Sequence, residues 1–433
     1  MNSRAMTGLE RQREIYLDGV AGTRPPVPIG FAALEQEARA HMSREGFAYI
    51  AGGAGRETTM ERNRADFERW RIVPRVLRDV GQRDLSVELL GQRLPTPFLL
   101  APIGALEMAH READLAVARA AAELQIPYIF SNQASVPMEQ CAAAMGAGPR
   151  WFQLYWSKSN ELVVSLVRRA EAAGCRAIVV TLDTTMLGWR TRDLELAFLP
   201  FLYGKGIAQY TSDPVFLDLL GLPQDTPPRR RVTLSSLKAL MLIAAAYPEG
   251  FWQGLVSGKA LAAVQTFVNI YTRPSLSWAD LPFLREHTRL PIVLKGILHP
   301  DDARRAVDAG MDGIIVSNHG GRQVDGAISA IEALGPVVES VAGRVPVLLD
   351  SGVYSGADAF RALALGARAV CIGRPYAYGL AIAGAAGVEA VLRNLIADFD
   401  LTMGLAGCRS VAEIGRESVV DDRPLPSLVS KQL

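Results

Sequence analysis

The sequence is poor in cysteine and has little net charge, and each of these shortages excludes certain kinds of site and partner. Four of the 433 residues are cysteines, and no two of them have the CxxC spacing of zinc and dithiol motifs. We therefore expect the cysteines to be buried apolar core residues. Lysine plus arginine (46) and aspartate plus glutamate (45) nearly cancel, leaving a formal charge of +1. This balance argues against nucleic acid or an anionic membrane as the main partner, and we predict no metal site.

Long apolar segments are also missing. A membrane span needs about 18 consecutive apolar residues, and the best stretch, 239–246, is much shorter. The first residues lack the apolar core of a signal peptide, and the last three, Lys-Gln-Leu, do not match the Ser-Lys-Leu peroxisomal signal. We therefore expect a cytoplasmic protein without a membrane partner.

Apolar residues, by contrast, make up 49% of the chain and recur in eight short runs, each followed by an Ala-rich amphipathic stretch. Such continuous runs fit strands of a parallel sheet that are buried on both faces. Two of the intervening stretches, 301–310 and 355–366, end at glycine, as helices commonly do. The runs begin at residues 98, 128, 151, 177, 291, 313, 345 and 369.

Eight strand-helix units predict an α/β fold, the (β/α)8 TIM barrel, rather than a doubly wound sheet. The runs at 177 and 291 start 114 residues apart, far more than the others. We therefore place an insertion at about 190–275, after the fourth strand, as a lid or an oligomer contact. The barrel is assigned to 97–410, after a helical and irregular N-terminal extension at 1–96 and before a C-terminal tail at 411–433. A basic run at 229–231 is expected in an exposed loop.

Residues with chemical function follow these strands, and a barrel brings its strand ends to one mouth. Arg190 and Arg322 carry planar guanidinium groups, which bind a small carboxylate in a bidentate manner. His319 and Asp183 suit proton abstraction, with the carboxylate fixing the imidazole tautomer. Lys295 suits the stabilisation of negative charge on a bound ring. The positions that correspond to the usual phosphate site of this architecture are Gly352, Gly373 and Arg374.

One motif has a specific resemblance. Ser-Asn-His-Gly-Gly-Arg-Gln at 317–323 resembles the active-site signature of the FMN-dependent α-hydroxy-acid oxidising enzymes. The similarity extends over nearly the whole barrel, with several motifs in the family's order. These further matches are Tyr49, Gln-Leu-Tyr at 153–155, Thr-Leu-Asp at 181–183, Leu-Lys-Gly at 294–296 and Gly-Cys-Arg-Ser at 407–410. The resemblance implies FMN as the cofactor and a homotetramer or homo-octamer as the assembly.

The resemblance also implies a role for each matching residue. His319 takes the proton of the substrate hydroxyl, Asp183 orients His319, and Tyr155 hydrogen-bonds the hydroxyl. The substrate carboxylate is held by Arg190, Arg322 and Tyr49. The residues implied to contact FMN are Pro102, Ile103, Gly104, Ser131, Gln153, Thr181, Lys295, Ser317, Asp350, Ser351, Gly352, Gly373 and Arg374.

One position departs from the family pattern. An arginine that helps to hold FMN commonly follows the seventh strand, and Tyr354 stands in its place. A tyrosine can donate one hydrogen bond but brings no positive charge. Three interpretations are open: FMN binds more weakly, Arg374 and backbone amides carry the phosphate, or the site binds FMN with altered reactivity.

Two features favour the branch similar to lactate 2-monooxygenase. The segments 188–194 and 210–216 of the insertion resemble that branch, and Gly104 stands where many oxidases have alanine, which would leave open space beside the flavin. The expected reaction is oxidation of L-lactate, or another short (S)-2-hydroxy acid, by O2 to acetate, CO2 and water. One alternative is an oxidase that releases the keto acid and H2O2 and that acts on a short or a bulkier 2-hydroxy acid. The other is a non-catalytic or isomerase FMN barrel.

Overall fold

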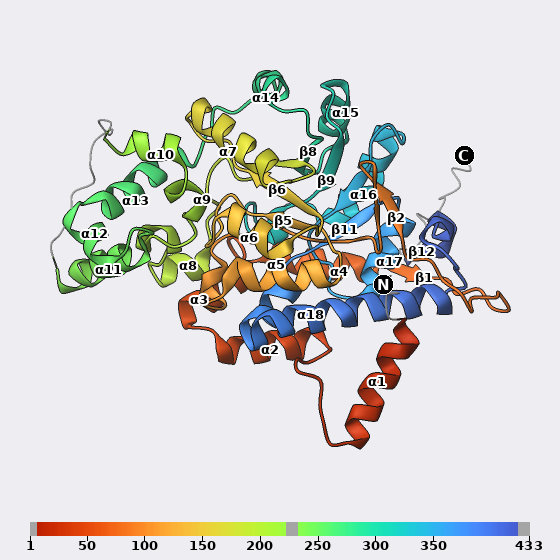
Figure 1. Cartoon of the computed structure of the whole chain (residues 1–433). Helices are drawn as coiled ribbons and strands as arrows, with labels where there is room; N and C mark the ends of the chain where they lie inside the picture. Colours follow the sequence, from red (N-terminus) through yellow and green to blue (C-terminus); the bar gives the residue numbers. More distant parts are fainter. Residues whose placement is uncertain (1–6, 222–232, 423–433) are drawn as a thin grey trace, which may run out of the picture.

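A closed barrel of parallel strands forms the centre of the protein, in the computed structural model that describes residues 7–221 and 233–422 (Figure 1). Each strand pairs with its neighbours in chain order, and the last pairs with the first. The predicted (β/α)8 fold is therefore confirmed. The basic run at 229–231 and the final residues of the predicted tail lie outside the described residues. The strands are β4 (Phe98–Leu100), β5 (Tyr128–Phe130), β6 (Arg150–Leu154), β7 (Ile178–Thr181), β8 (Ile292–Ile297), β9 (Gly313–Val316), β10 (Val347–Leu349) and β11 (Ala369–Ile372).

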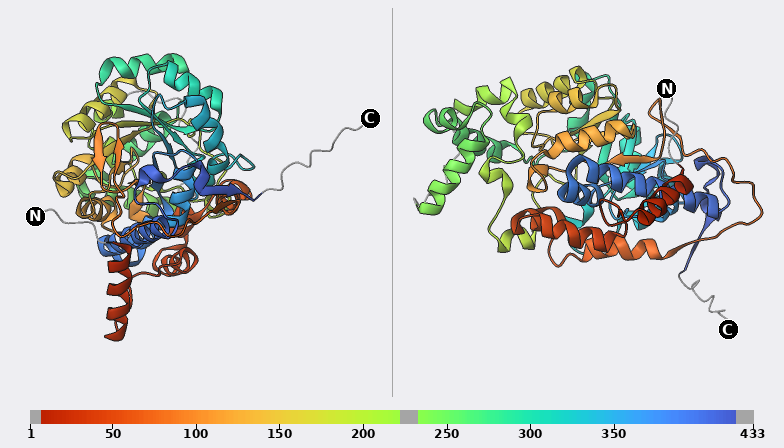
Figure 2. Two further views of the ribbon diagram at one scale, coloured as in Figure 1. Left: turned by 90° about the vertical axis from the view of Figure 1, so that its right-hand side faces the viewer. Right: turned by 60° about the horizontal axis from the view of Figure 1, so that its bottom comes forward.

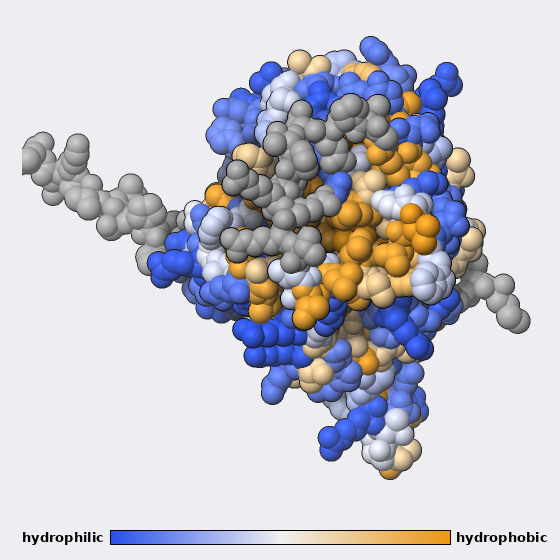
Figure 3. Space-filling view, turned by 90° about the vertical axis from the view of Figure 1, so that its left-hand side faces the viewer, coloured by the Kyte–Doolittle hydropathy of each residue, from blue (hydrophilic) through white to orange (hydrophobic). Residues whose placement is uncertain are grey.

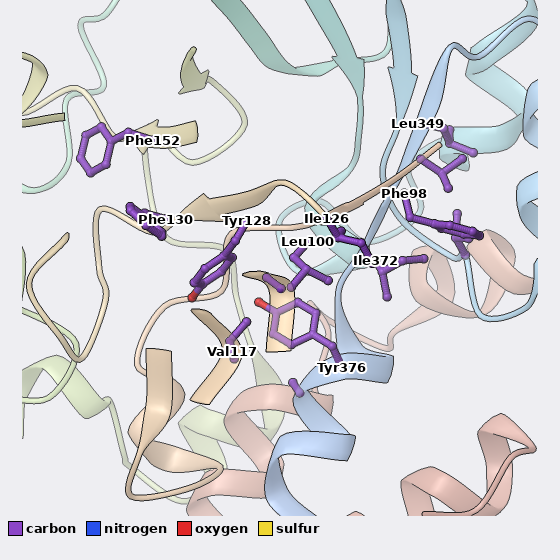
Figure 4. Packing of buried hydrophobic residues seen from close by; sticks show 14 of the residues in the cluster. Phe98, Leu100, Val117, Ile126, Tyr128, Phe130, Phe152, Leu349, Ile372 and Tyr376 are labelled. Atoms are coloured by element: carbon purple, nitrogen blue, oxygen red, sulfur yellow. The ribbon is translucent and has the colours of Figure 1, made fainter. Parts of the chain in front are cut away.

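The strands are apolar throughout because each one is buried on two sides. Leu99, Ile129 and Trp151 belong to a core inside the barrel, whereas Phe98 and Tyr128 belong to a core between the strands and the surrounding helices. Figure 4 shows part of this outer core. Alternate residues of one strand thus serve different cores, which removes the polar alternation of a half-exposed strand. All four cysteines are buried and free, as the sequence predicted.

Helices surround the barrel and connect its strands. The expected helices at 301–310 and 355–366 correspond to α15 and α17. The last helix, α18, is long and apolar enough to cross a membrane by length and composition alone, but it is largely buried and packs against α5, α17 and α2. The helices are α5 (Ala113–Glu123), α6 (Met138–Met145), α7 (Asn160–Ala172), α14 (Leu281–His287), α15 (Pro300–Asp308), α16 (Ala330–Val341), α17 (Gly356–Ala364) and α18 (Arg374–Leu405), with α2 (Phe31–His41) from the N-terminal extension.

The N-terminal extension contacts both ends of the barrel. Its hairpin of β2 (Val87–Leu89) and β3 (Gln92–Leu94) adds side chains to the core inside the barrel and so closes one end. At the other end, α3 (Arg44–Ala51) contacts the insertion, and α4 (Thr58–Glu68) packs on the turn after β9. Helix α1 (Gly8–Val20) projects from the body (Figures 1 and 2).

The C-terminal residues return to this extension. Strand β12 (Val419–Asp421) pairs antiparallel with β1 (Trp70–Ile72), after two short 3-10 helices, η6 (Val411–Glu413) and η7 (Arg416–Ser418). The described part of the predicted tail is therefore tied to the N-terminal region. No sequence pattern indicated this pairing, because each strand has only three residues.

The insertion between β7 and β8 is helical and projects from the barrel end opposite the β1–β12 pair (Figure 1, green; Figure 2, right). Its α11 covers the short apolar stretch at 239–246. The elements are α8 (Thr191–Glu195), η2 (Pro200–Tyr203), α9 (Ala208–Thr211), α10 (Pro214–Asp218), η3 (Leu219–Gly221), α11 (Leu234–Ala246), α12 (Phe251–Val256) and α13 (Lys259–Ile270), followed by η4 (Trp278–Asp280) and α14.

Candidate active site

The carboxyl ends of the strands surround a cavity. Most of the residues that the sequence placed at a common mouth line it, although they come from the N-terminal extension, six strands and the insertion. The predicted residues in the lining are Tyr49, Pro102, Ile103, Gly104, Tyr155, Arg190, Lys295, His319, Arg322, Asp350, Gly373 and Arg374.

A histidine–aspartate pair lies at this cavity. His319 Nδ1 donates to Asp183 Oδ1 at 2.8 Å, and Thr184 Oγ1 donates to the same carboxylate oxygen at 2.9 Å. Burial raises the pKa of Asp183, but the charges of His319 and Lys295 outweigh it and lower that pKa to about 2. Burial also lowers the pKa of His319, against the opposing effect of Asp183. The imidazole is therefore neutral near pH 7, with its proton on Nδ1 and Nε2 available as a base.

The turn that carries His319 depends on its two glycines. His319, Gly320 and Gly321 all have positive φ, in the short 3-10 helix η5 (His319–Gly321). A Cβ on Gly321 would come within 2.6 Å of the backbone nitrogen of Met60 in α4, so only glycine allows this packing. Asn318 Oδ1 accepts from Gly321 N at 3.1 Å and closes the turn. The motif thus fixes where His319 lies.

Lys295 is buried beside the same pair. Its Nζ donates to Ser317 Oγ at 3.0 Å and lies 3.1 Å from Asp350 Oδ2 and 4.0 Å from Asp183 Oδ2. Burial disfavours the charge, but Asp350 and Asp183 raise the pKa of Lys295 above its usual value. The ammonium group is therefore a fixed positive charge in the cavity wall, suited to stabilising an anionic ring.

Two guanidinium groups meet on the other side of the cavity. Arg190 Nε donates to the carbonyl of Arg322 at 3.4 Å, and Arg322 donates to the carbonyls of Tyr49 and Gly52. Burial and the charge of Arg190 lower the pKa of Arg322. The Arg322 guanidinium lies 5.1 Å from the centre of the Tyr49 ring, which offers a weak cation–π contact. Two buried like charges favour binding of an anion, and a carboxylate matches their fork geometry.

Tyr155 and Asp193 complete the polar surroundings. Burial raises the pKa of Tyr155 to about 12, so its phenol keeps its proton and can donate a hydrogen bond. Asp193, at the start of the insertion, is buried near the two arginines, and burial raises its pKa above the usual value. The sequence did not single out Asp193.

The cavity also fits the FMN that the sequence implied. Gln153 Oε1 accepts from Ser131 Oγ and Asn132 N, while Gln153 Nε2 and Thr181 Oγ1 are buried without a hydrogen-bond partner among the described residues. These unpaired groups lie near the carboxyl ends of β6 and β7, and Thr181 pairs with Lys295 of β8; a bound flavin ring would offer acceptors and donors to them. Gln153, Thr181, Ser131 and Lys295 would hold the ring, and Arg374 would face the phosphate.

The phosphate side differs in part from the expectation. Arg374 lines the cavity and donates to the carbonyls of Gly320 and Gly52, both at 2.9 Å. Ser351 Oγ accepts from Gly320 N at 2.9 Å, and Gly352 packs closely on α4. Tyr354 points into a different groove and stacks on Phe31 at 3.7 Å. Arg374, and not Tyr354, therefore brings a side chain to this side of the cavity.

Gly104 corrects one interpretation. The sequence suggested that the missing methyl group leaves open space beside the flavin. A Cβ at this position would instead lie 3.0 Å from Gln133 Cβ and 3.2 Å from Gln133 O. Gly104 lines the cavity, but its glycine serves close packing against Gln133, and the inference of open space is wrong.

Besides Asp193, further lining or supporting residues escaped the sequence reasoning. Thr184 holds Asp183, and Gln323 holds the loop after β7 by donating to the carbonyls of Asp183 and Met186. Phe201 and Tyr271 enter the cavity wall from the insertion. The position of Thr184 next to Asp183 was a usable signal, whereas no pattern marks Phe201 and Tyr271.

Comparisons with known proteins agree with this geometry. The sequence model of the FMN-dependent dehydrogenase family matches residues 38–421. An L-lactate oxidase of Lysinibacillus sphaericus (strain C3-41) is 44% identical, over 89% of this chain and 91% of that protein. An FMN-dependent alpha-hydroxy acid dehydrogenase of Penicillium citrinum is 42% identical, over 94% of each. The crystal structure of a mandelate oxidase with (S)-4-hydroxymandelic acid has a TM-score of 0.75 and 38% identity, over 91% of this chain and 98% of that one. The chain belongs to the family of FMN-dependent dehydrogenases that oxidise α-hydroxy acids.

Proposed function

We propose that the enzyme oxidises a short (S)-2-hydroxy acid, L-lactate, with O2 and releases acetate, CO2 and water. The observation that carries the proposal is the convergence of His319–Asp183 and Arg190–Arg322 on one cavity. The 44% identity to an L-lactate oxidase supports the choice of substrate. Lactate plus O2 balances as acetate, CO2 and one water.

Each cavity residue has a defined task in this proposal. Arg190, Arg322 and the Tyr49 hydroxyl bind the carboxylate and so orient the substrate. His319 Nε2 accepts the hydroxyl proton, and Asp183 stabilises the resulting imidazolium. FMN, when bound, supplies the acceptor for the hydrogen that leaves Cα with its electron pair, and passes the electrons to O2.

Tyr155 and Lys295 stabilise negative charge and do not take up the proton of the substrate hydroxyl. The Tyr155 phenol, kept protonated by burial, donates to the substrate oxygen as it becomes a carbonyl. Lys295, held by Asp350 and Ser317, would place its positive charge where it can stabilise negative charge on a bound flavin ring.

Retention of the product is the step that separates decarboxylation from simple oxidation. Pyruvate and H2O2 react to acetate, CO2 and water if both stay together after reoxidation. Phe201 and Tyr271, from the insertion, form part of the cavity wall and support a role of the insertion as a lid.

The second candidate is an oxidase that releases the keto acid and H2O2. The relatives named as L-lactate oxidase and mandelate oxidase favour it, as does the aromatic wall, which would suit a bulkier side chain. Anaerobic L-lactate should bleach the flavin absorbance, whereas an isomerase or a non-catalytic barrel would show no reduction. Under air, equal yields of free H2O2 and pyruvate would refute decarboxylation.

We also propose that the chain forms a homotetramer or homo-octamer. Figure 3 shows an apolar surface on the side of the molecule that carries the insertion. Exposed apolar patches of this kind commonly mark interfaces. Light scattering coupled to gel filtration should give four or eight chains, and a monomer would overturn the proposal. The exposed residues are Leu234, Leu237, Met241, Leu242, Trp252 and Val256.

A further inference from the structure

The insertion is connected to the catalytic end of the barrel by a buried tyrosine. Tyr210, in α9, has a fully buried side chain, and its hydroxyl accepts from Asn132 Nδ2 at 2.7 Å. Its ring packs edge-on against Phe216 and Phe267 within the insertion. The ring of Tyr210 thus packs inside the insertion, whereas its hydroxyl contacts Asn132 in the loop after β5.

Asn132 joins this hydroxyl to two residues of the site. Its Oδ1 accepts from Tyr155 N at 3.1 Å, and its own backbone N donates to Gln153 Oε1 at 3.0 Å. A backbone N–H can only donate, so Oδ1 must face Tyr155 and Nδ2 must face Tyr210. Asn132 is itself fully buried, and its amide has one orientation that satisfies both ends.

The two residues that Asn132 contacts are the ones whose placement matters for the reaction. Tyr155 lines the cavity. Gln153 Oε1 accepts from Asn132 N and Ser131 Oγ, and Gln153 Nε2 is buried without a partner among the residues that the structure describes. Rotation of the Asn132 amide would release Tyr155 N. Any accompanying shift of the Asn132 backbone would turn the Gln153 amide.

We propose that Tyr210 is a positioning residue, which acts through Asn132 to place the Tyr155 phenol and the Gln153 amide at the flavin and substrate. This inference rests on the proposed roles of Tyr155 and Gln153. It gives the insertion a second task besides covering the cavity, because the insertion then controls the alignment of groups that belong to the barrel.

Tyr210→Phe tests the proposal, since it removes the hydroxyl and keeps the ring between Phe216 and Phe267. Loss of alignment should lower the rate of anaerobic flavin reduction by about 10- to 100-fold. The KM for the 2-hydroxy acid should change little, because Arg190 and Arg322 are untouched. The Kd for FMN, measured from quenching of FMN fluorescence by the apoprotein, should rise. Tyr203→Phe is the matched control, since this insertion tyrosine stacks on Phe198, and it should behave as wild type.

A second variant breaks the same connection from the other side. Asn132→Ala should reproduce the loss of rate, and adding Tyr210→Phe to it should have no further effect. If Tyr210→Phe lowers only the melting temperature and leaves the reduction rate and FMN Kd unchanged, the residue is merely structural and the proposal is overturned. If no 2-hydroxy acid reduces the flavin of the wild-type enzyme, the proposed function fails instead. In that case an unchanged Kd for FMN in Tyr210→Phe would separately overturn the inference about Tyr210.

Discussion

The Asp183→Asn variant tests the catalytic pair most directly. The pKa of Asp183 lies at about 2, against 3.8 for an ordinary aspartate, and this difference corresponds to about 2.5 kcal/mol in favour of the carboxylate. Among the charges that lower this pKa, His319 contributes more than Lys295. In Asp183→Asn the neutral amide no longer provides most of this stabilisation to the His319 imidazolium that forms during the reaction. The rate of flavin reduction should therefore fall by about 30- to 100-fold. The asparagine keeps the size of the side chain, so the geometry of the cavity is conserved.

Anaerobic stopped-flow measurement of flavin reduction gives the rate and its pH dependence. In the wild type, kcat/KM should rise with pH as His319 loses its proton, with a midpoint below 6.5 because burial lowers its pKa. Asp183 opposes that shift, so the midpoint should move to still lower pH in Asp183→Asn. Asp193→Asn makes the same chemical change beside the arginines and should alter KM rather than the reduction rate. A reduction rate within about threefold of wild type in Asp183→Asn would refute the assigned role of the pair.

Three further variants address the other parts of the site. Arg322→Met should raise KM for the 2-hydroxy acid by about 10- to 100-fold, because a charge-assisted bond is worth about 1.5–3 kcal/mol, and an unchanged KM would remove Arg322 from the carboxylate site. Phe201→Ala should raise kcat/KM for mandelate relative to L-lactate by enlarging the cavity wall, whereas an unaltered ratio would show that another residue limits substrate size. Because Tyr354 lies in a different groove, Tyr354→Arg and Tyr354→Phe should both leave the Kd for FMN unchanged in equilibrium binding, and a lower Kd in Tyr354→Arg would show that Arg374 alone does not suffice.

The barrel was predictable because its signal is local and repeated. Each strand is a short run buried on two sides, and each run is followed by a helix, so the eight units could be read without any knowledge of contacts between them. The site followed from the same logic, since His319, Arg322 and Lys295 each stand at or just beyond a strand end. A parallel barrel necessarily brings those ends together.

The N-terminal extension and the insertion lack such a repeated local signal, so their contacts could not be predicted from the sequence. The β1–β12 pair joins residues 70–72 to 419–421, and nothing in a three-residue strand specifies a partner so distant in sequence. Phe201 and Tyr271 lie in a segment whose aromatic residues are all equally plausible as core, and only the fold shows which of them face the cavity. The inference about Gly104 was wrong for the opposite reason. The sequence placed Gly104 correctly at the cavity, but only the fold shows that a Cβ there would meet Gln133, a residue that follows the neighbouring strand.

The charges around the cavity explain why one site takes two anionic groups. The charge of Lys295 is compensated, because its ammonium group lies near the carboxylates of Asp350 and Asp183. Arg190, Arg322 and Arg374 instead donate to backbone and amide oxygens. Arg190 is buried and Arg322 and Arg374 are half-buried, so removing their positive charge from water has a cost that carbonyl dipoles offset only in part. A substrate carboxylate between Arg190 and Arg322, and a phosphate at Arg374, would each lower that cost, so the same residues that recognise the ligands should be stabilised by them. Saturating FMN should therefore raise the melting temperature of the apoprotein, and a carboxylate that cannot react should raise it further in wild type but not in Arg322→Met.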